Sequence, residues 1–167
     1  PIYCRKKESL DAPEEVMLDV NTLAEGYNYF QVSGLDVSPD NKLLAYGVDT
    51  VSRRKYTIYV KNLETGELLT ESIPNTEGYS EWANDNKTMY YVKKDDVTLR
   101  SYQIYRHELG QQNDYLVYQE NDETFSVFIT KSKSDKFLLI GSSSTLSDEY
   151  RFLDADKPSG EFKVIQP

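Results

Sequence analysis

The stretch "SPDNKLLAY" at residues 38–46 decides the fold, because it reads as a tight polar turn followed by an apolar strand. The proline fixes one backbone angle of the turn, and the Asp and Asn after it carry side chains that bond the local backbone. The same pattern returns as "ANDNKTMYY" at 83–91 and as "SKSDKFLLI" at 132–140. Three such hairpins at nearly constant spacing indicate a repeated architecture.

Two further landmarks keep the same period. Strand-like segments that begin with tyrosine lie at 56–63, 102–109 and 150–157, so their first residues are 46 and 48 positions apart. Another strand-like segment then follows in each unit, at 67–73, 114–120 and 161–166. Four strands about every 45 residues are typical of β-propeller blades. The tyrosine-rich composition, with 14 tyrosines, also favours strands.

The repeat predicts an all-β chain that forms a partial β-propeller of about three and a half four-stranded antiparallel blades. The blades are expected at 25–73, 74–120 and 121–167, after two outer strands of a preceding blade within 1–24. Helix should be scarce, with one short turn at "NTLAE", residues 21–25. On propeller geometry, the second-to-third-strand loops and the blade-to-blade connections should emerge on one face.

Composition narrows the classes of partner. The net charge of −9 argues against general binding to nucleic acid or to anionic membranes, since both need basic surfaces. The longest apolar runs are short pieces such as "FLLI", far below the roughly 20 residues that span a bilayer. Cys4 is the single cysteine, which fits a reducing compartment, and a cytoplasmic location is expected.

No residue pattern in the chain predicts a catalytic centre. The serine-rich "GSSST" at 141–145 has Thr145 where a nucleophile elbow needs its second glycine. The single histidine, His107, ends a predicted strand and is expected to be structural or exposed. Cys4 has no acid–base partner near it in sequence. No catalytic residue is therefore assigned.

The sequence also predicts no metal site and no cofactor. The stretch "DADKPSGEFKVI" at 154–165 begins like a calcium loop. It places Ser159 where the loop glycine belongs and Ile165 where the bidentate glutamate belongs. Acidic pairs such as Asp95 and Asp96 fall in predicted loops, where solvated charge is the expected state.

Two long stretches of the sequence are specific to a family: "EEVMLDVNTLAEG" at 14–26 and "GLDVSPDNKLLAYGVDTVSRRKYTIYVKNLETGELL" at 34–69. In their order along the chain they resemble the oligopeptidase B branch of the prolyl oligopeptidase family of serine peptidases. It continues through "WANDNKTMYYV" at 82–92 and "YQIYRHELG" at 102–110, and so covers essentially the whole chain.

The resemblance implies a longer, two-domain polypeptide. A seven-bladed propeller would cap an α/β-hydrolase domain that carries a Ser-Asp-His triad and cleaves short basic peptides after Arg or Lys. The propeller would act as a filter that keeps folded proteins away from the triad. The hydrolase domain is absent from residues 1–167, so the resemblance implies that this chain is inactive on its own.

The same resemblance places the hydrolase over the face that carries the loops "TVSRRK" at 50–55 and "NTEGY" at 75–79. Glu77 falls where similar enzymes carry an acidic residue near the substrate channel. Arg53 and Arg54 lie in the neighbouring loop, where they could pair across the gap between domains. The alternative is that all three residues are solvated loop charges.

Two other functions stay open at this stage, namely a propeller scaffold for protein–protein interaction and a carbohydrate- or ligand-binding propeller. The second would need repeated aromatic and acidic pairs in equivalent loops, which the sequence lacks. A short arc of blades also leaves two apolar sheet faces without a neighbour. Residues 1–167 alone are therefore expected to self-associate through those faces.

Overall fold

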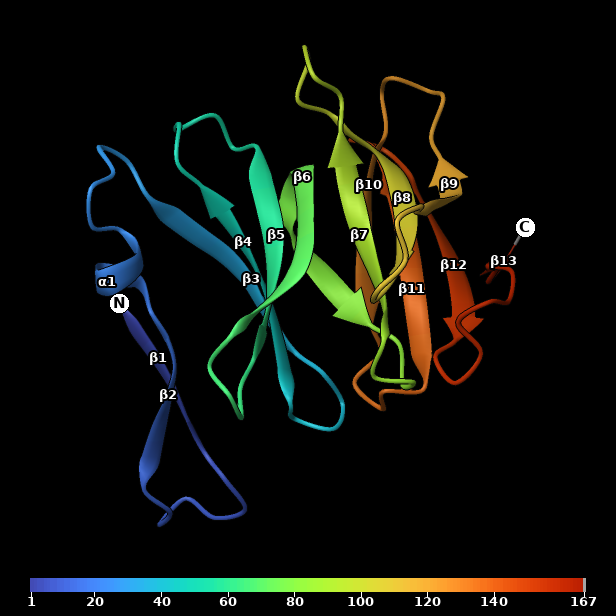
Figure 1. Cartoon of the computed structure of the whole chain (residues 1–167). Helices are drawn as coiled ribbons and strands as arrows, with labels where there is room; N and C mark the ends of the chain where they lie inside the picture. Colours follow the sequence, from blue (N-terminus) through green and yellow to red (C-terminus); the bar gives the residue numbers. More distant parts are fainter. Residues whose placement is uncertain (167) are drawn as a thin grey trace.

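The computed structural model describes residues 1–166 and consists almost entirely of strands (Figure 1). The elements are β1 (Ile2–Lys6), β2 (Glu14–Asp19), α1 (Val20–Leu23), β3 (Gln31–Val37), β4 (Leu43–Asp49), β5 (Tyr56–Asn62), β6 (Leu68–Trp82), β7 (Thr88–Lys94), β8 (Ser101–Glu108), β9 (Tyr115–Gln119), β10 (Ser126–Lys131), β11 (Phe137–Ser143), β12 (Asp148–Asp154) and β13 (Lys163–Val164). The short α1 overlaps the helical turn that the sequence predicted.

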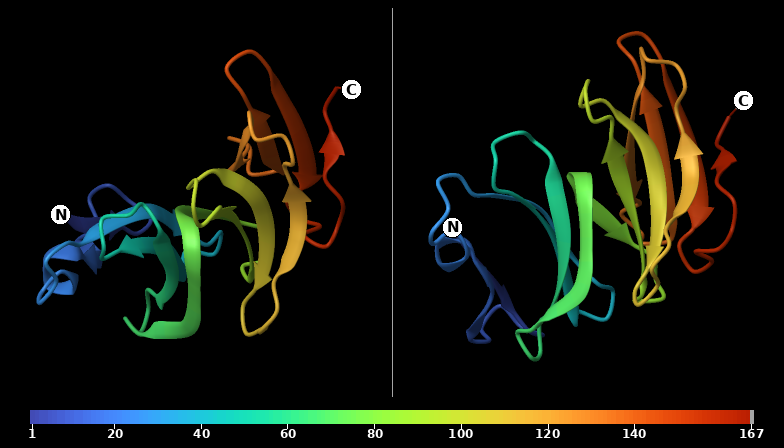
Figure 2. Two further views of the ribbon diagram at one scale, coloured as in Figure 1. Left: turned by 90° about the horizontal axis from the view of Figure 1, so that it is seen from above. Right: turned by 45° about the horizontal axis from the view of Figure 1, so that its top comes forward.

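The strands form three antiparallel sheets in which each strand pairs with its neighbours in sequence. The sheets hold β1–β2, β3–β9 and β10–β13, with two, seven and four strands. Seen from above, they stand side by side and follow an open arc from the N-terminus to the C-terminus (Figure 2). The predominance of strands and their antiparallel pairing confirm the all-β prediction.

The repeated turns show why the same short motif recurs. Asn41, Asn86 and Asp135 occupy the same place in the three turns, and their φ angles are +62°, +62° and +57°. Asn and Asp tolerate this left-handed backbone better than other non-glycine residues. In the first turn, Ser38 Oγ donates to Asp40 and accepts from the main-chain nitrogen of Leu43.

The strand β6 corrects one prediction from the sequence. Residues 75–79 were expected to form a loop between blades, but β6 runs through them for 15 residues without a break. Its first half pairs with β5 (Ile58 with Ile73) and its second half pairs with β7 (Ser80 with Tyr91). Two predicted blades therefore share one strand and merge into the seven-stranded sheet.

Gly78 allows β6 to pass from one blade to the next, and this part of the strand is called the crossing. Its φ of +97° lies in the region that favours glycine, and an added Cβ would sit 2.6 Å from the ring of Tyr56. The carbonyl oxygen of Gly78 in turn lies 2.3 Å from the Cβ that a side chain would place at Gly34 or at Gly47. The bent strand thus packs directly on β3 and β4, with no room for side chains between the backbones.

Both blades of the seven-stranded sheet are buried on their two faces. On β4, Leu44 and Tyr46 pack toward the β1–β2 hairpin, whereas Ala45 between them packs on the other side, in the cluster around Trp82. On β7, Tyr90 and Tyr91 divide in the same way between two clusters. Such two-sided burial explains why these strands read as continuous apolar runs rather than alternating ones.

Candidate functional site

The candidate site lies at the end of the blades where the β4–β5 and β7–β8 connections emerge together (Figure 1). This end is called the loop face. These connections hold residues 50–55 and 95–100, and the crossing in β6 passes beside them. The sequence placed Arg53, Arg54 and Glu77 here. The structure adds the residues that bind them, which lie on the next blade.

Glu77 forms an ion pair inside the chain. Its Oε2 lies 2.7 Å from Nζ of Lys94 and accepts a hydrogen bond of 2.8 Å from Oγ of Ser101. The side chain of Lys94 is only 6% exposed, whereas that of Glu77 is 34% exposed. Because a buried ammonium needs a counter-charge, Glu77 first of all neutralises Lys94. The prediction that Glu77 lies in a loop is wrong, since it stands on β6.

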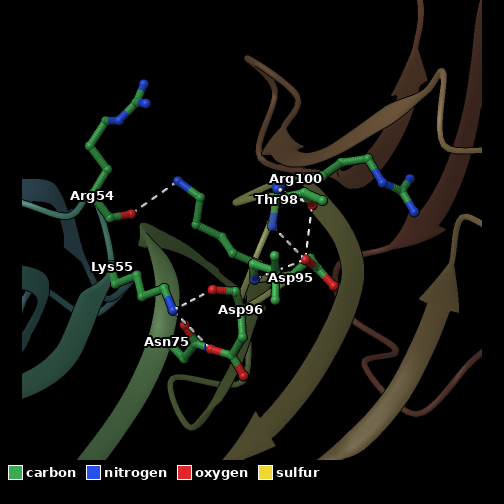
Figure 3. Close-up of polar contacts among 9 residues, drawn as sticks. Arg54, Lys55, Asn75, Asp95, Asp96, Thr98 and Arg100 are labelled. Atoms are coloured by element: carbon green, nitrogen blue, oxygen red, sulfur yellow. Dashed lines mark hydrogen bonds and ion pairs between the residues drawn. The ribbon is translucent and has the colours of Figure 1, made fainter.

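Lys94 also holds the arginine loop. Its Nζ donates to the main-chain oxygen of Arg54 at 3.0 Å. Figure 3 marks this hydrogen bond by a dashed line that begins at the main-chain oxygen of Arg54. The guanidinium of Arg54 extends away from this contact (Figure 3). Within the described part of the chain, no hydrogen bond or ion pair engages the guanidinium of Arg53 or Arg54, and both residues are exposed.

A buried carboxylate shapes the loop that presents these arginines. Asp49 is 1% exposed, and its Oδ2 accepts from the main-chain nitrogens of Arg53 and Arg54 at 3.0 and 2.8 Å. Its Oδ1 accepts from that of Val51 at 2.9 Å. Arg54 adopts a φ of +53°, which these bonds stabilise. Asp49 therefore fixes the direction in which both arginines leave the surface.

A second set of polar contacts joins the same two blades (Figure 3). Nζ of Lys55 donates to Oδ1 and to the main-chain oxygen of Asp96, at 3.0 and 2.8 Å, and the side-chain amide of Asn75 donates to the same Oδ1 at 2.8 Å. The bond from Lys55 holds the pKa of Asp96 below its usual range. Sequence reasoning treated Asp96 as a solvated charge and missed this role.

The neighbouring residue Asp95 closes the β7–β8 turn. Its Oδ1 accepts from the main-chain nitrogens of Thr98 and Val97 at 2.7 and 3.0 Å (Figure 3). The bonds from Thr98 lower the pKa of Asp95. At the far side of the turn, Arg100 donates to the main-chain oxygen of Phe125 at 2.8 Å and so ties the turn to the third blade.

The residues considered as catalytic candidates have other surroundings. Ser142 is 1% exposed, so a substrate has no open path to its Oγ, which donates to Glu120 at 2.5 Å. His107 is buried against Asp114, far along the strand from the loop face. Cys4 is an exposed free thiol. Across residues 1–166, no group of three or more His, Cys, Asp or Glu side chains is placed to hold a metal ion.

Asp36 on β3 and Glu81 on the second half of β6 form a further acidic pair. These strands begin consecutive blades and are called the inner strands. Asp36 on β3 accepts from the main-chain nitrogen of Trp82 at 3.2 Å, which joins consecutive inner strands. Asp36, Glu81 and Lys131 line a cavity of about 460 Å³. Burial, together with the charge of Glu81, raises the pKa of Asp36 to about 7. Burial likewise raises the pKa of Glu81 to about 7, against the attraction of Lys131.

The comparisons with known proteins decide the family. Residues 1–167 match the N-terminal beta-propeller domain of prolyl oligopeptidase. The chain belongs to this family. The partial-propeller prediction is thereby confirmed, and so is the resemblance to prolyl oligopeptidases.

The curated relatives of this chain are much longer proteins. The chain is 46% identical over 158 residues to a dipeptidyl aminopeptidase BI of Pseudoxanthomonas mexicana, covering 93% of this chain and 22% of the relative. It is 38% identical over 174 residues to protease 2 of Moraxella lacunata, covering 99% of this chain and 25% of that protein. The chain thus spans about a quarter of the length of the curated relatives it matches.

Solved structures of oligopeptidase B have the same fold over this part of the chain. The propeller superposes on oligopeptidase B from Leishmania major with a TM-score of 0.88 and 31% identity, covering 99% of this chain and 24% of that one. Oligopeptidase B from Trypanosoma brucei, in a closed form with covalently bound antipain, gives a TM-score of 0.84 and 27% identity at the same coverage.

No helix among residues 1–166 has the length and apolar character that crossing a membrane requires.

Proposed function

We propose that residues 1–167 are part of a propeller that admits short peptides to a serine-peptidase domain of the same polypeptide, which cleaves after Arg or Lys. The observation that carries this proposal is the likeness to oligopeptidase B over 99% of the chain. The propeller would exclude folded proteins by size, and the peptidase domain would perform the chemistry. A cytoplasmic location belongs to the same proposal.

The charges of the loop face support a role at the gap between domains. Oε2 of Glu77 is engaged by Lys94 and Ser101, whereas no partner is described for its Oε1 among residues 1–166. That oxygen is available to a cationic group of a passing substrate. The exposed guanidinium groups of Arg53 and Arg54 suit carboxylates on the facing domain. A contact made only in the closed form would favour closure and so gate catalysis.

The test uses the full-length protein with two peptides that differ by a second basic residue. Glu77→Lys should lower turnover of the dibasic peptide about two- to fivefold more than that of the monobasic one, since an exposed charge contact contributes roughly 0.5–1 kcal/mol. The double variant Glu77→Lys with Lys94→Glu restores the ion pair but moves the negative charge inward. We expect it to recover folding stability without recovering the dibasic preference.

Equal losses for the two peptides in the Glu77→Lys variant would place Glu77 outside the substrate path. Full recovery of the dibasic preference by the double variant would show that Glu77 acts only through Lys94. Glu67→Lys, a charge reversal at an exposed residue between β5 and β6, is the matched control. It should leave both peptides unaffected.

A second candidate function is dipeptidyl aminopeptidase activity, which the 46% identity to the relative of that name favours. A pair of arginyl substrates with free and blocked N-termini separates the two functions. Cleavage of the blocked peptide supports the oligopeptidase proposal, whereas cleavage confined to the free N-terminus supports the dipeptidyl aminopeptidase. Absence of hydrolysis of either peptide by the full-length protein would favour an interaction scaffold.

A further inference from the structure

A second cavity lies between the outer strand of one blade and the next blade, away from the loop face. Its volume is about 510 Å³, which is within the range of small-molecule sites. Residues 70–74 of β6 form one wall, and Tyr91, His107 and Asp114 form the other. None of the residues of the proposed peptidase-facing site takes part in it.

His107 faces this cavity with a fixed ring. Its Nδ1 lies 2.7 Å from Oδ1 of Asp114, whose Oδ2 accepts from the hydroxyl of Tyr91 at 2.6 Å. Burial opposes ionisation of Asp114, but the hydrogen bonds from His107 and Tyr91 outweigh it and lower the pKa of Asp114. The carboxylate therefore holds a proton on Nδ1 of His107, and in the neutral ring Nε2 is then an acceptor. Within residues 1–166 that buried Nε2 has no hydrogen-bond partner, and His107 is 5% exposed.

Glu71 supplies a second acceptor from the opposite wall. Its Oε1 accepts from the main-chain nitrogen of Gly110 at 2.8 Å, which fixes the carboxylate. Its Oε2 is buried and likewise lacks a hydrogen-bond partner among the described residues. Lys93 is the one lysine of the cavity, and its ammonium lies over the ring of Tyr105, 5.4 Å from the centroid. Among residues 1–166 it forms no ion pair with Glu71.

We propose that this cavity binds a guanidinium group, such as that of arginine or an arginyl peptide, between Oε2 of Glu71 and Nε2 of His107. Buried acceptors without partners are costly, and a ligand that supplies N–H donors removes that cost. A guanidinium carries five such donors in a planar fork and a charge that matches Glu71. The site would be an accessory one on the propeller, and it does not depend on the proposed peptidase activity.

Nitrogen NMR of the imidazoles in the full-length protein gives a direct test, and the signal that a His107→Gln variant loses identifies His107. Titration with argininamide should move the Nε2 signal of His107 in a saturable way. Citrullinamide has the same shape without the charge and should produce little change. Glu71→Gln keeps an oxygen for Gly110 but loses the charge, and it should weaken argininamide binding about tenfold.

Glu108→Gln is the matched control, because it removes a neighbouring carboxylate that pairs with Lys87 outside the cavity. It should leave the affinity unchanged. Three results would overturn the inference: no saturable change at His107, an equal response to citrullinamide, or unchanged affinity in a folded Glu71→Gln variant. Any of these would mean that the cavity holds water only. Circular dichroism of each variant establishes that it is folded.

Discussion

Single carboxylates on the inner strands join consecutive blades, and they do so in an environment that disfavours their charge. Asp36 accepts from the main chain of the next inner strand, and it faces Glu81 and Lys131 across a shared cavity. Burial raises the pKa of Asp36 to about 7, well above the value of about 4 in an unfolded chain. The folded state therefore binds more protons than the unfolded state between these two values, so stability falls as pH rises through this window.

Replacing Asp36 by Asn tests this at the residue scale. The amide oxygen still accepts from Trp82, whereas the buried charge is gone. Asp36→Asn should raise the free energy of unfolding by up to about 4 kcal/mol at pH 8, since one pKa unit corresponds to about 1.4 kcal/mol. The gain should shrink toward pH 4. Urea unfolding at pH 8 and pH 5.5 measures it, and a gain that stays constant with pH would show that Asp36 ionises normally.

At the scale of elements, the crossing in β6 is where sequence and structure differ most. The turns and the second strand of each blade were predictable, because a Pro-Asp-Asn type of turn and an apolar run are local signals. The crossing contains Pro74, Asn75 and Gly78, which read as a loop, yet pairing with β5 on one side and β7 on the other keeps it extended. Only the tertiary arrangement supplies that pairing.

The candidate site, too, was predictable only in part. Family resemblance pointed to Glu77 and to the two arginines. Lys94 was missed because it ends a strand on another blade, and a lysine at a strand end usually reads as a solvated charge. Its burial follows from the approach of the arginine loop and of Glu77, which no local pattern encodes.

Gly47→Ala tests the tight crossing. The new Cβ would lie 2.3 Å from the carbonyl oxygen of Gly78, which belongs to a strand backbone and cannot turn aside as a flexible side chain could. The sheets would have to move apart, so we expect a loss of about 1–3 kcal/mol in the free energy of unfolding. Gly66→Ala, in open space but with a φ of +79°, should cost only about 1 kcal/mol. Equal losses in thermal or urea unfolding would contradict the close packing.

For the whole molecule, the arc leaves apolar surface at both ends. Ile2 and Val16 on the first hairpin are 53% and 60% exposed, and Tyr150 on β12 is 40% exposed. Residues 1–167 studied alone should therefore associate. Light scattering over a dilution series should show masses above the 19.3 kDa of one chain. Val16→Glu combined with Tyr150→Glu should reduce the association, and a wild-type monomer at high concentration would contradict the expectation.

The central proposal is that this chain is part of the propeller of a serine peptidase and performs no hydrolysis itself. The most direct measurement treats the full-length protein and residues 1–167 separately with a serine-directed fluorophosphonate, followed by mapping of the labelled residue. The claim predicts labelling of the full-length protein at one serine outside residues 1–167, with loss of activity on an arginyl peptide. Labelling of Ser142, Ser143 or Ser144, or of any serine in the isolated chain, would contradict it.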